Sequence, residues 1–368
     1  MRILEAFGEP ISYGGQESFV MNVLEHMDRS GMDIDLLTPY FCDNPGIEEK
    51  LKEWGCVLYS LDVDFRPGSL RSPARRPIER FLSEHRYDII HIHSGSNSML
   101  EMYAKLAHRA GIRRIIVHSH STGRNDWKHA ASRIFTSYGL RRYPTDYCAC
   151  SVEAGKWRFP AEICNRSLRV ISDGIYAESF RYDNNRRKAV REELNLTDDT
   201  VLVGVAGRLS SEKNQRFMLE CIKDISSMPE GRRYRLILIG DGTDRNELAE
   251  LSEELGISDR VIFTGFTNHI YEYYQAIDVL AVPSLYEGFG MVILEGQAAG
   301  LDVIVSDRVP KATRLTGSVS FLPLEDKTAW IDALMSVHER HPENADIISG
   351  SSVSIRKTVS DVMAMYGE

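Results

Sequence analysis

Short apolar runs recur along the chain and alternate with longer segments in which polar and apolar residues mix. Runs of this length, rich in Val, Ile and Leu, are typical of strands buried on both faces of a parallel sheet. We expect strands over Arg2–Phe7, Ile34–Thr38, Asp88–His93, Arg114–His118, Asp146–Ser151, Val201–Ala206, Arg235–Ile239, Arg260–Phe263, Val279–Pro283 and Val303–Ser306. Because strands that alternate with helix-length segments form βαβ units, the pattern predicts an α/β fold throughout.

The least sheet-like interval runs from Ser172 to Arg191 and contains Asp173-Gly174. At 368 residues the chain also exceeds what one hydrophobic core usually organises. We therefore predict two parallel-sheet domains, residues 1–172 and 173–345, and a C-terminal helical segment, 346–368, that packs back toward the first domain. Such sheets bind ligands at the carboxyl ends of their strands, so we expect the functional site between the domains.

The amino-acid composition argues against several classes of function. The chain has 44 Lys and Arg against 53 Asp and Glu, a formal net charge of -9, which argues against a nucleic-acid-coating protein. No signal-peptide pattern opens the sequence and no apolar run approaches the roughly 20 residues of a spanning helix, so we expect neither export nor a membrane span. The six cysteines form no CxxC pair, which indicates a reducing, cytoplasmic setting. Cys148 and Cys150 are expected to be small buried hydrophobes.

Positive charge is concentrated between residues 66 and 142, which hold 15 Lys or Arg and 5 Asp or Glu. The formal net charge of this stretch is +10, which leaves a net charge of -19 for the rest of the chain. A solvated helix face explains such a region, and so does peripheral contact with an anionic membrane, such as the inner face of the cell membrane. Both interpretations stay open.

The most informative stretch is Ala281–Gly300, whose pattern predicts a strand, a glycine-containing loop and a helix. Glu287 lies in the loop, and Glu295 lies among apolar residues of the helix. If the chain between them were fully helical, its rise would separate the two by about 12 Å, enough to hold opposite ends of an extended ligand. A helix that starts near Gly290 points free N–H groups at an anion. Exposed carboxylates on an ordinary amphipathic helix are the alternative.

Two cations, Arg208 and Lys213, lie in the segment Gly207–Asn214 after an apolar strand. At the carboxyl end of a strand they suit a diphosphate, since Arg supplies a planar donor fork and Lys a compact charge. Surface cations in a turn explain this segment equally well. The loops at Gly240 and at Gly265-Phe266 also follow strands, so we expect all these segments on one rim of the second sheet.

In the first half, Gly14-Gly15 joins the first strand to a helix without a GxGxxG pattern, which weakens a dehydrogenase interpretation. The glycines permit a phosphate or sugar to approach, or they form a plain tight turn. His91/His93 and His118/His120 each end a strand with both side chains on one face. Such pairs can bind a metal, as in metal-dependent hydrolases. We instead expect no metal, with at least one of these histidines in the core and at least one a donor in the cleft.

Two DxD triplets, Asp33/Asp35 and Asp62/Asp64, raise the class of sugar transferases that hold a divalent ion on the diphosphate. Asp33 and Asp35 open an early strand, whereas Asp62 and Asp64 lie in a Pro-Gly loop. We interpret both triplets as solvated turns.

Taken together, these motifs resemble the retaining glycosyltransferases of family 4, in particular their bacterial capsule and exopolysaccharide branch. The motifs are GGQE at Gly14, HSHST at His118, GRLSSEKN at Gly207, GDG at Gly240, FTGF at Phe263 and the pair Glu287/Glu295. The resemblance implies the GT-B architecture: two Rossmann-like domains that face a central cleft, the first binding the acceptor and the second the donor. One departure is Asp173-Gly174-Ile175, where the family more often has Asn.

The resemblance also implies residue roles. Arg208 and Lys213 would bind the donor diphosphate, and Glu295 the ribose hydroxyls. Glu287 would hold the transferred sugar, and His120 would face its reacting side. The remaining donor-binding positions implied are Gly15, Gly240, Phe266 beside the base, and the amides of Gly290, Met291 and Val292.

The implied activity is metal-independent transfer of a hexose or N-acetylhexosamine from a nucleotide-diphosphate sugar, with UDP the expected nucleotide. The acceptor would be a glycan or a polyprenyl-diphosphate-linked glycan in surface polysaccharide synthesis, and no cofactor is needed. Retention without an enzymic nucleophile implies same-face substitution, in which the leaving phosphate helps deprotonate the acceptor. A nucleotide-sugar epimerase of the same architecture and a non-catalytic sugar-nucleotide-binding protein are the alternatives.

Overall fold

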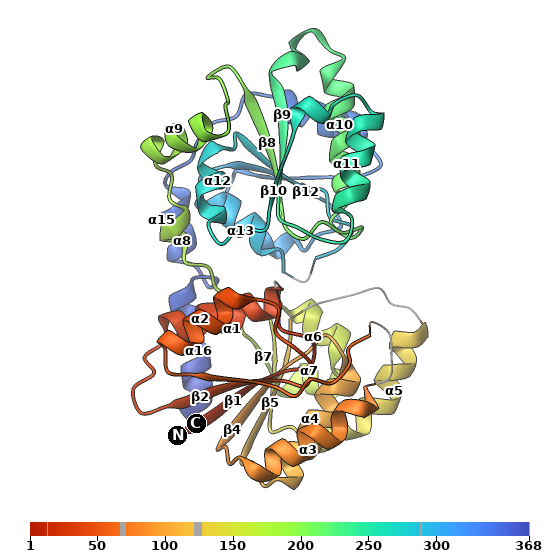
Figure 1. The fold of residues 1–368 in the computed structure, drawn as a ribbon, viewed down its shortest axis with the longest axis vertical. Coiled ribbons are helices and arrows are strands. Elements are labelled where there is room, and N and C mark those ends of the chain that lie inside the picture. The colour runs from red at the N-terminus through yellow and green to blue at the C-terminus, as the bar shows by residue number, and fades with distance from the viewer. Residues whose placement is uncertain (13, 67–70, 121–126, 288, 368) are drawn as a thin grey trace. The chain divides into compact units, whose positions relative to one another are not determined.

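The computed structural model describes residues 1–12, 14–66, 71–120, 127–287 and 289–367, and only the backbone of 127–134. The chain forms two compact units (Figure 1). Unit 1 comprises Met1–Gly174 and Ile355–Glu368, and unit 2 comprises Ile175–Ser354. Residues 346–354 therefore belong with unit 2, and the returning segment is the last helix.

Unit 1 is built on a parallel sheet. Within the described residues its strand order is β3-β2-β1-β4-β5-β6-β7. The strands are β1 (Arg2–Phe7), β2 (Asp33–Thr38), β3 (Val57–Ser60), β4 (Ile89–His93), β5 (Arg114–Ser119), β6 (Asp146–Ala149) and β7 (Leu168–Val170). The helices are α1 (Gly15–His26), α2 (Pro45–Glu53), α3 (Arg75–Glu84), α4 (Asn97–Arg109), α5 (Trp127–Arg142), α6 (Val152–Arg158), α7 (Ala161–Arg166) and α16 (Ile355–Gly367), with a 3-10 turn, η1 (Ser72–Ala74).

Two apolar layers cover the faces of this sheet. One contains Ile78, Tyr103 and other residues of α3 and α4, and the second contains Phe19 and Leu24 of α1. Helix α16 adds Val362, Met365 and Tyr366 to the second layer, where it packs beside α1 (Figure 1). The end of the chain thus completes the core of the unit in which the chain begins.

Unit 2 repeats the design with the strand order β10-β9-β8-β11-β12-β13 in the described residues, again parallel. The strands are β8 (Val201–Ala206), β9 (Tyr234–Ile239), β10 (Val261–Gly265), β11 (Val279–Val282), β12 (Asp302–Ser306) and β13 (Val319–Leu322). The helices are α8 (Ala177–Phe180), α9 (Asn184–Glu193), α10 (Gln215–Ser226), α11 (Arg245–Glu254), α12 (Ile270–Ala276), α13 (Met291–Ala298), α14 (Lys327–Met335) and α15 (Asn344–Ser349), with 3-10 turns η2 (Pro229–Arg233), η3 (Ser258–Arg260) and η4 (Lys311–Thr313).

The strand order reverses direction once in each sheet, between β1 and β4 in unit 1 and between β8 and β11 in unit 2. Loops that follow the two strands at such a point diverge to opposite faces, and open α/β sheets bind their ligands there. The reversal points therefore mark where each unit is suited to a ligand.

The structure confirms the α/β prediction and adds three strands, β3, β7 and β13, that the apolar pattern did not reveal. All three lie at sheet edges. Strand β3 has no fully buried residue, and β7 is mostly exposed. Edge strands need no continuous apolar run, so their sequences carry a weaker signal.

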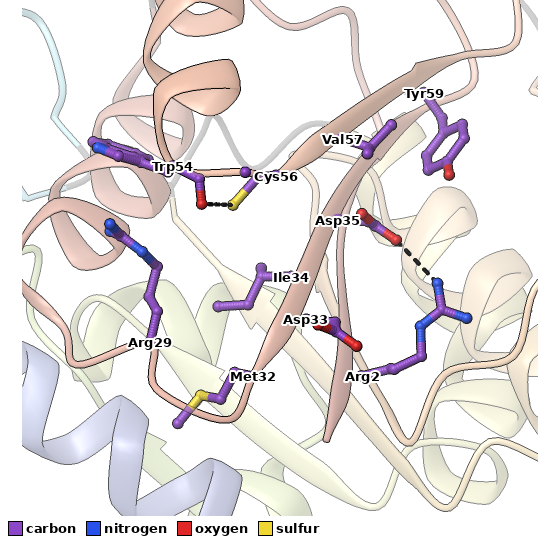
Figure 2. A pocket seen from close by; sticks show the side chains of 11 residues that line it. Arg2, Arg29, Met32, Asp33, Ile34, Asp35, Trp54, Cys56, Val57 and Tyr59 are labelled. Atoms are coloured by element: carbon purple, nitrogen blue, oxygen red, sulfur yellow. Dashed lines mark hydrogen bonds and ion pairs between the residues drawn. The ribbon is translucent and has the colours of Figure 1, made fainter.

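The interpretation of Asp33 and Asp35 as a solvated turn is wrong for Asp35, which lies buried inside β2. Its Oδ2 accepts hydrogen bonds from Tyr87 Oη at 2.7 Å and from Arg2 at 3.4 Å. Figure 2 shows Asp35 beside a cavity of about 390 Å³ at the amino-terminal ends of the strands. Asp62 and Asp64 are exposed, in keeping with a turn.

Candidate active site

The clearest polar arrangement of unit 2 joins the two strands at its reversal point. Lys213 lies in the loop after β8 and Glu287 in the loop after β11. Lys213 Nζ donates to both carboxylate oxygens of Glu287, at 2.6 and 2.8 Å. Ser284 Oγ donates to Glu287 Oε1 at 2.7 Å, and both Ser284 and Glu287 are buried. The buried carboxylate of Glu287 is thus neutralised by Lys213 and hydrogen-bonded by Ser284.

Arg208 precedes this pair on the same loop and is exposed. Its carbonyl accepts from Gln215 Nε2 at 2.9 Å, which fixes the backbone of the loop to the start of α10. Among the described residues its guanidinium has no hydrogen-bond or ion-pair partner. The structure therefore leaves Arg208 with its full charge available for a ligand, whereas Lys213 is already engaged.

Glycines let the loops of this rim pack backbone against backbone. Gly240 has φ 133°, and a Cβ there would lie 2.3 Å from the carbonyl oxygen of Gly207. Its N–H donates to Gly265 O at 3.1 Å, and Leu209 N donates to Asp241 O at 2.9 Å. Gly240, one of the predicted donor-binding positions, thus lets its loop pack closely against the loop that carries Arg208 and holds that loop in place.

Helix α13 begins at Met291, after Gly290 in the left-handed conformation (φ 89°). The predicted helix start near Gly290 is confirmed, and Glu287 lies in the loop before it, so the separation calculated for a fully helical chain does not apply to Glu287 and Glu295. The first amides of a helix lack acceptors within it, and here those of Met291 and Val292 follow the loop that carries Glu287. This arrangement places anion-binding N–H groups close in sequence to the Lys213 pair.

Glu295 lies in the middle of α13 and is only partly accessible. Desolvation by burial raises the pKa of its carboxyl to about 7, although the hydrogen bond from Tyr274 Oη at 2.9 Å and the charge of Lys213 act against that rise. The fully buried Tyr274 thus fixes the carboxylate. With a pKa of about 7, the Glu295 carboxyl changes charge near neutral pH, so any hydrogen bond that it accepts from a ligand would depend on pH.

The other predicted positions are less constrained by contacts. Phe266, after β10, is about 43% exposed. Gly15 starts α1 in unit 1, and a Cβ there would meet nothing within 4 Å. Gly288, Ser121 and Thr122 lie outside the described residues.

The reversal point of unit 1 carries a cluster of four imidazoles and one carboxylate. His93 of β4 lies between Glu5 of β1 and His120, which follows β5. The distance from His93 Nε2 to Glu5 Oε2 is 2.7 Å, and that from His93 Nδ1 to His120 Nε2 is 2.8 Å. His120 Nδ1 lies 3.5 Å from Asp173 Oδ1. The predicted residue His120 therefore belongs to a line of buried polar side chains that also contains Glu5, His93 and Asp173.

A second line of hydrogen-bonded side chains starts from the carboxylate of Glu5. Tyr366 Oη, from α16, donates to Glu5 Oε1 and lies 2.8 Å from His91 Nδ1. His91 Nε2 in turn lies 3.1 Å from His118 Nδ1. Burial lowers the pKa values of His91, His93 and His118 well below 6.5 and raises that of Glu5. The three core imidazoles are therefore neutral at neutral pH.

Three of these histidines, His91, His93 and His118, bring ligand nitrogens within 4.8 Å of one another, which a metal ion would require. Their hydrogen bonds, however, already use both nitrogens of His91 and His93 and one of His118. A metal would have to break these bonds. The geometry favours a hydrogen-bonded cluster, and the absence of a metal stays a prediction.

Sequence reasoning did not find Ser284, Tyr274, Glu5 or Tyr366. Ser284 carried a weak signal, because it directly follows a strand and a proline. Glu5 carried a stronger one, as a charged residue inside an otherwise apolar strand, which is unusual unless paired. Tyr366 comes from the far end of the chain, and only the fold brings it to Glu5.

Two family models match the chain. Residues 14–155 match the glycosyl transferase 4-like domain, and residues 186–347 match glycosyl transferases group 1. Together with the two parallel-sheet units, these matches show that the chain belongs to the glycosyltransferases of GT-B architecture.

Individual relatives agree with this assignment. The chain is 27% identical over 329 residues to "Putative glycosyltransferase EpsF" of Bacillus subtilis (strain 168), covering 87% of this chain and 84% of that one. It is 27% identical over 239 residues to the UDP-Gal:alpha-D-GlcNAc-diphosphoundecaprenol alpha-1,3-galactosyltransferase of Escherichia coli, covering 62% and 60%. The fold matches that of Anabaena Alr3699/HepE in complex with UDP-glucose, with a TM-score of 0.77, 19% identity and coverage of 100% and 99%.

Proposed function

We propose that this glycosyltransferase is a retaining, metal-independent enzyme of family 4. It would move a hexose or N-acetylhexosamine from a UDP-sugar to a glycan or polyprenyl-diphosphate-linked acceptor in surface polysaccharide synthesis. The observation that carries the proposal is the constellation at the reversal point of unit 2: the exposed Arg208, whose guanidinium has no partner among the described residues, the buried Lys213–Glu287 pair, and the first amides of α13.

Each part of this constellation suits one part of a nucleotide sugar. Arg208, Lys213 and the helix amides offer positive charge for a diphosphate, and stabilising that departing group is the main electrostatic task of the reaction. Glu287 accepts hydrogen bonds, as sugar hydroxyls require. Glu295, once ionised, would accept from the ribose. The complex of Alr3699/HepE with UDP-glucose and the name of the Escherichia coli relative support the choice of UDP.

The acceptor side is proposed for unit 1, with His120 beside the reacting centre. The name of the Escherichia coli relative supports a diphosphoundecaprenol-type acceptor. No helix in the described part of the chain is long and apolar enough to span a membrane. Exposed Phe135 and Tyr138 of α5 lie on one helix with Arg141 and Arg142, which supports peripheral contact with anionic lipid.

A donor screen tests this function. Thermal shift with UDP-, GDP- and TDP-sugars identifies the nucleotide, and the stabilising sugar is then incubated with and without a lipid-diphosphate-linked glycan. We expect release of the nucleotide diphosphate only when the acceptor is present. Conversion of the donor without an acceptor would favour the epimerase, and binding without turnover across acceptors would favour the non-catalytic protein.

A further inference from the structure

Glu5, His93, His120 and Asp173 form one line of buried polar side chains in unit 1. Each of these four side chains is less than a tenth exposed. The two inner contacts, Glu5 to His93 and His93 to His120, are 2.7 and 2.8 Å long. These distances are those of strong hydrogen bonds, so each contact contains one proton.

The order of these protons follows from counting donors. A neutral imidazole donates from one nitrogen and accepts on the other, and an ionised carboxylate only accepts. If Glu5 is ionised, His93 donates from Nε2 and accepts at Nδ1. His120 must then carry its proton on Nε2, which leaves Nδ1 to face Asp173.

The outer end of the line supports this order. His120 Nδ1 and Asp173 Oδ1 are both buried and, among the described residues, neither has a hydrogen-bond partner. Two lone pairs 3.5 Å apart in a buried place repel unless one proton lies between them. The line therefore holds three protons: one in each inner contact and one between His120 and Asp173, carried either by Asp173 or by a doubly protonated His120.

The same three protons fit the opposite order. Asp173 gives its proton to Nδ1 of His120, Nε2 of His120 gives its proton to Nδ1 of His93, and Nε2 of His93 gives its proton to Glu5. No proton is gained or lost, and each moves along one contact. Burial raises the pKa of Glu5, but the ionised form is favoured in this network because Tyr366 Oη donates to its second oxygen while accepting from His91.

We propose that Glu5 and His93 are positioning residues that hold the proton on Nε2 of His120, and that Asp173 completes a line along which a proton passes to Glu5. The importance of this line for transfer rests on the proposed function, in which His120 meets the sugar. Its proton order does not depend on that function. Asparagine at position 173, frequent in the family that the sequence resembles, would donate to Nδ1 and fix the first order permanently.

Nitrogen-15 NMR of histidine-labelled full-length protein reads the protonated nitrogen of each ring, with His120→Gln assigning the His120 signals. We expect the wild type to carry a proton on His120 Nε2. In Glu5→Gln the amide oxygen stays with Tyr366 and the amide N–H₂ donates to His93, so every contact reverses. His120 should then be protonated on Nδ1 and not on Nε2. Asp173→Asn should retain the Nε2 proton.

One further variant and one control make the result specific. Tyr366→Phe removes the hydroxyl that favours ionised Glu5, so His120 should lose part of its Nε2 proton in favour of Nδ1. Asp35→Asn makes the same carboxyl-to-amide change at a buried site on the neighbouring strand β2, where Tyr87 donates to Asp35, and should leave all four imidazoles unchanged. Thermal melts check that each variant folds. An unprotonated Nε2 in the wild type, or the same His120 tautomer in Glu5→Gln, overturns the proposal.

Kinetics then test the consequence for transfer. Reversing the proton order leaves Asp173 ionised beside His120, and a changed charge near the reacting sugar affects the chemical step, so Glu5→Gln should lower kcat by at least about tenfold and leave the donor KM nearly unchanged. Asp35→Asn should retain wild-type kcat. Equal kcat in Glu5→Gln and wild type would remove the role in transfer. If the wild type turns over no donor, the proposed function fails while the NMR result still decides the proton order.

Discussion

At the scale of single residues, Arg208 and Lys213 share a loop but differ in their surroundings. The Arg208 guanidinium is exposed and has no partner in the part of the chain that the structure describes, whereas Lys213 neutralises buried Glu287. A charge-assisted phosphate contact is worth about 1.5–3 kcal/mol, so Arg208→Ala and Lys213→Ala should each weaken UDP binding by more than about tenfold. Calorimetry measures this loss. Unchanged affinity in both variants would contradict the donor site.

The same pair predicts a difference in stability. Lys213→Ala leaves the Glu287 carboxylate buried without its cation, and uncompensated buried charges are strongly destabilising. Arg208→Ala removes no hydrogen bond or ion pair to any residue that the structure describes. We therefore expect thermal melting to show a lower Tm for Lys213→Ala and an unchanged Tm for Arg208→Ala. Equal Tm values would mean that the ion pair contributes nothing to folding.

Glu295 gives a pH-dependent prediction. Its folded pKa of about 7 lies above the ordinary value of 4.5, so the folded state binds the proton more tightly than the unfolded state. This contribution to stability is full below about pH 4.5 and is lost as the pH rises through 7. Ribose hydroxyls donate to the ionised form, so UDP affinity should rise between pH 6 and pH 8. In Glu295→Gln, both the loss of stability with rising pH and the rise in UDP affinity should disappear. A wild-type affinity independent of pH would refute the ribose contact.

Glu287 and Glu295 should separate kinetically. A ribose contact is equally strong in the ground and transition states, so Glu295→Ala should mainly raise the donor dissociation constant. A contact to the transferred sugar can strengthen as its anomeric carbon gains positive charge, so Glu287→Ala should mainly lower turnover. Steady-state kinetics with direct UDP titration measures both quantities. The reverse pattern would require the two roles to be exchanged.

At the scale of elements, the predictable features were those whose cause lies in neighbouring residues. The central strands carry continuous apolar runs, and the cations after β8 follow directly from position in the chain. The network around Glu5 depends instead on the register of three strands and on a helix from the far terminus. Tyr274 reaches Glu295 from α12 in the same way. Such contacts have no local pattern, so sequence reasoning could name the four histidines but not Glu5, Tyr366 or the contacts among them.

The loops of the unit 2 rim give an element-scale prediction. Gly240→Ala would put a methyl group 2.3 Å from the Gly207 carbonyl at a φ that side chains rarely adopt. The loop that carries Arg208 must then shift, so both Tm and UDP affinity should fall. Gly317→Ala is the matched control, because a Cβ there meets nothing within 4 Å. A Gly240→Ala protein with wild-type Tm and affinity would contradict the close packing of these loops.

At the scale of the whole molecule, charge is divided between a basic stretch in the first unit and an acidic remainder. Well-placed cations contribute about 1 kcal/mol each near an anionic surface, and salt screens them. The fraction of protein that sediments with anionic vesicles should therefore fall as the salt concentration rises. The double variant Arg141→Ser and Arg142→Ser should reduce this fraction further. Equal binding to neutral and anionic vesicles would leave only a solvated surface.

The central claim is retaining transfer from a UDP-sugar by a diphosphate site made of protein cations and helix amides. Proton NMR of the reaction with an α-linked UDP-sugar, in EDTA and with Arg208→Ala as control, tests it most directly. We predict a product with an α-linked anomeric proton, formed at the same rate with EDTA and far more slowly by the variant. A β-linked product, or turnover that EDTA abolishes and manganese restores, would contradict it.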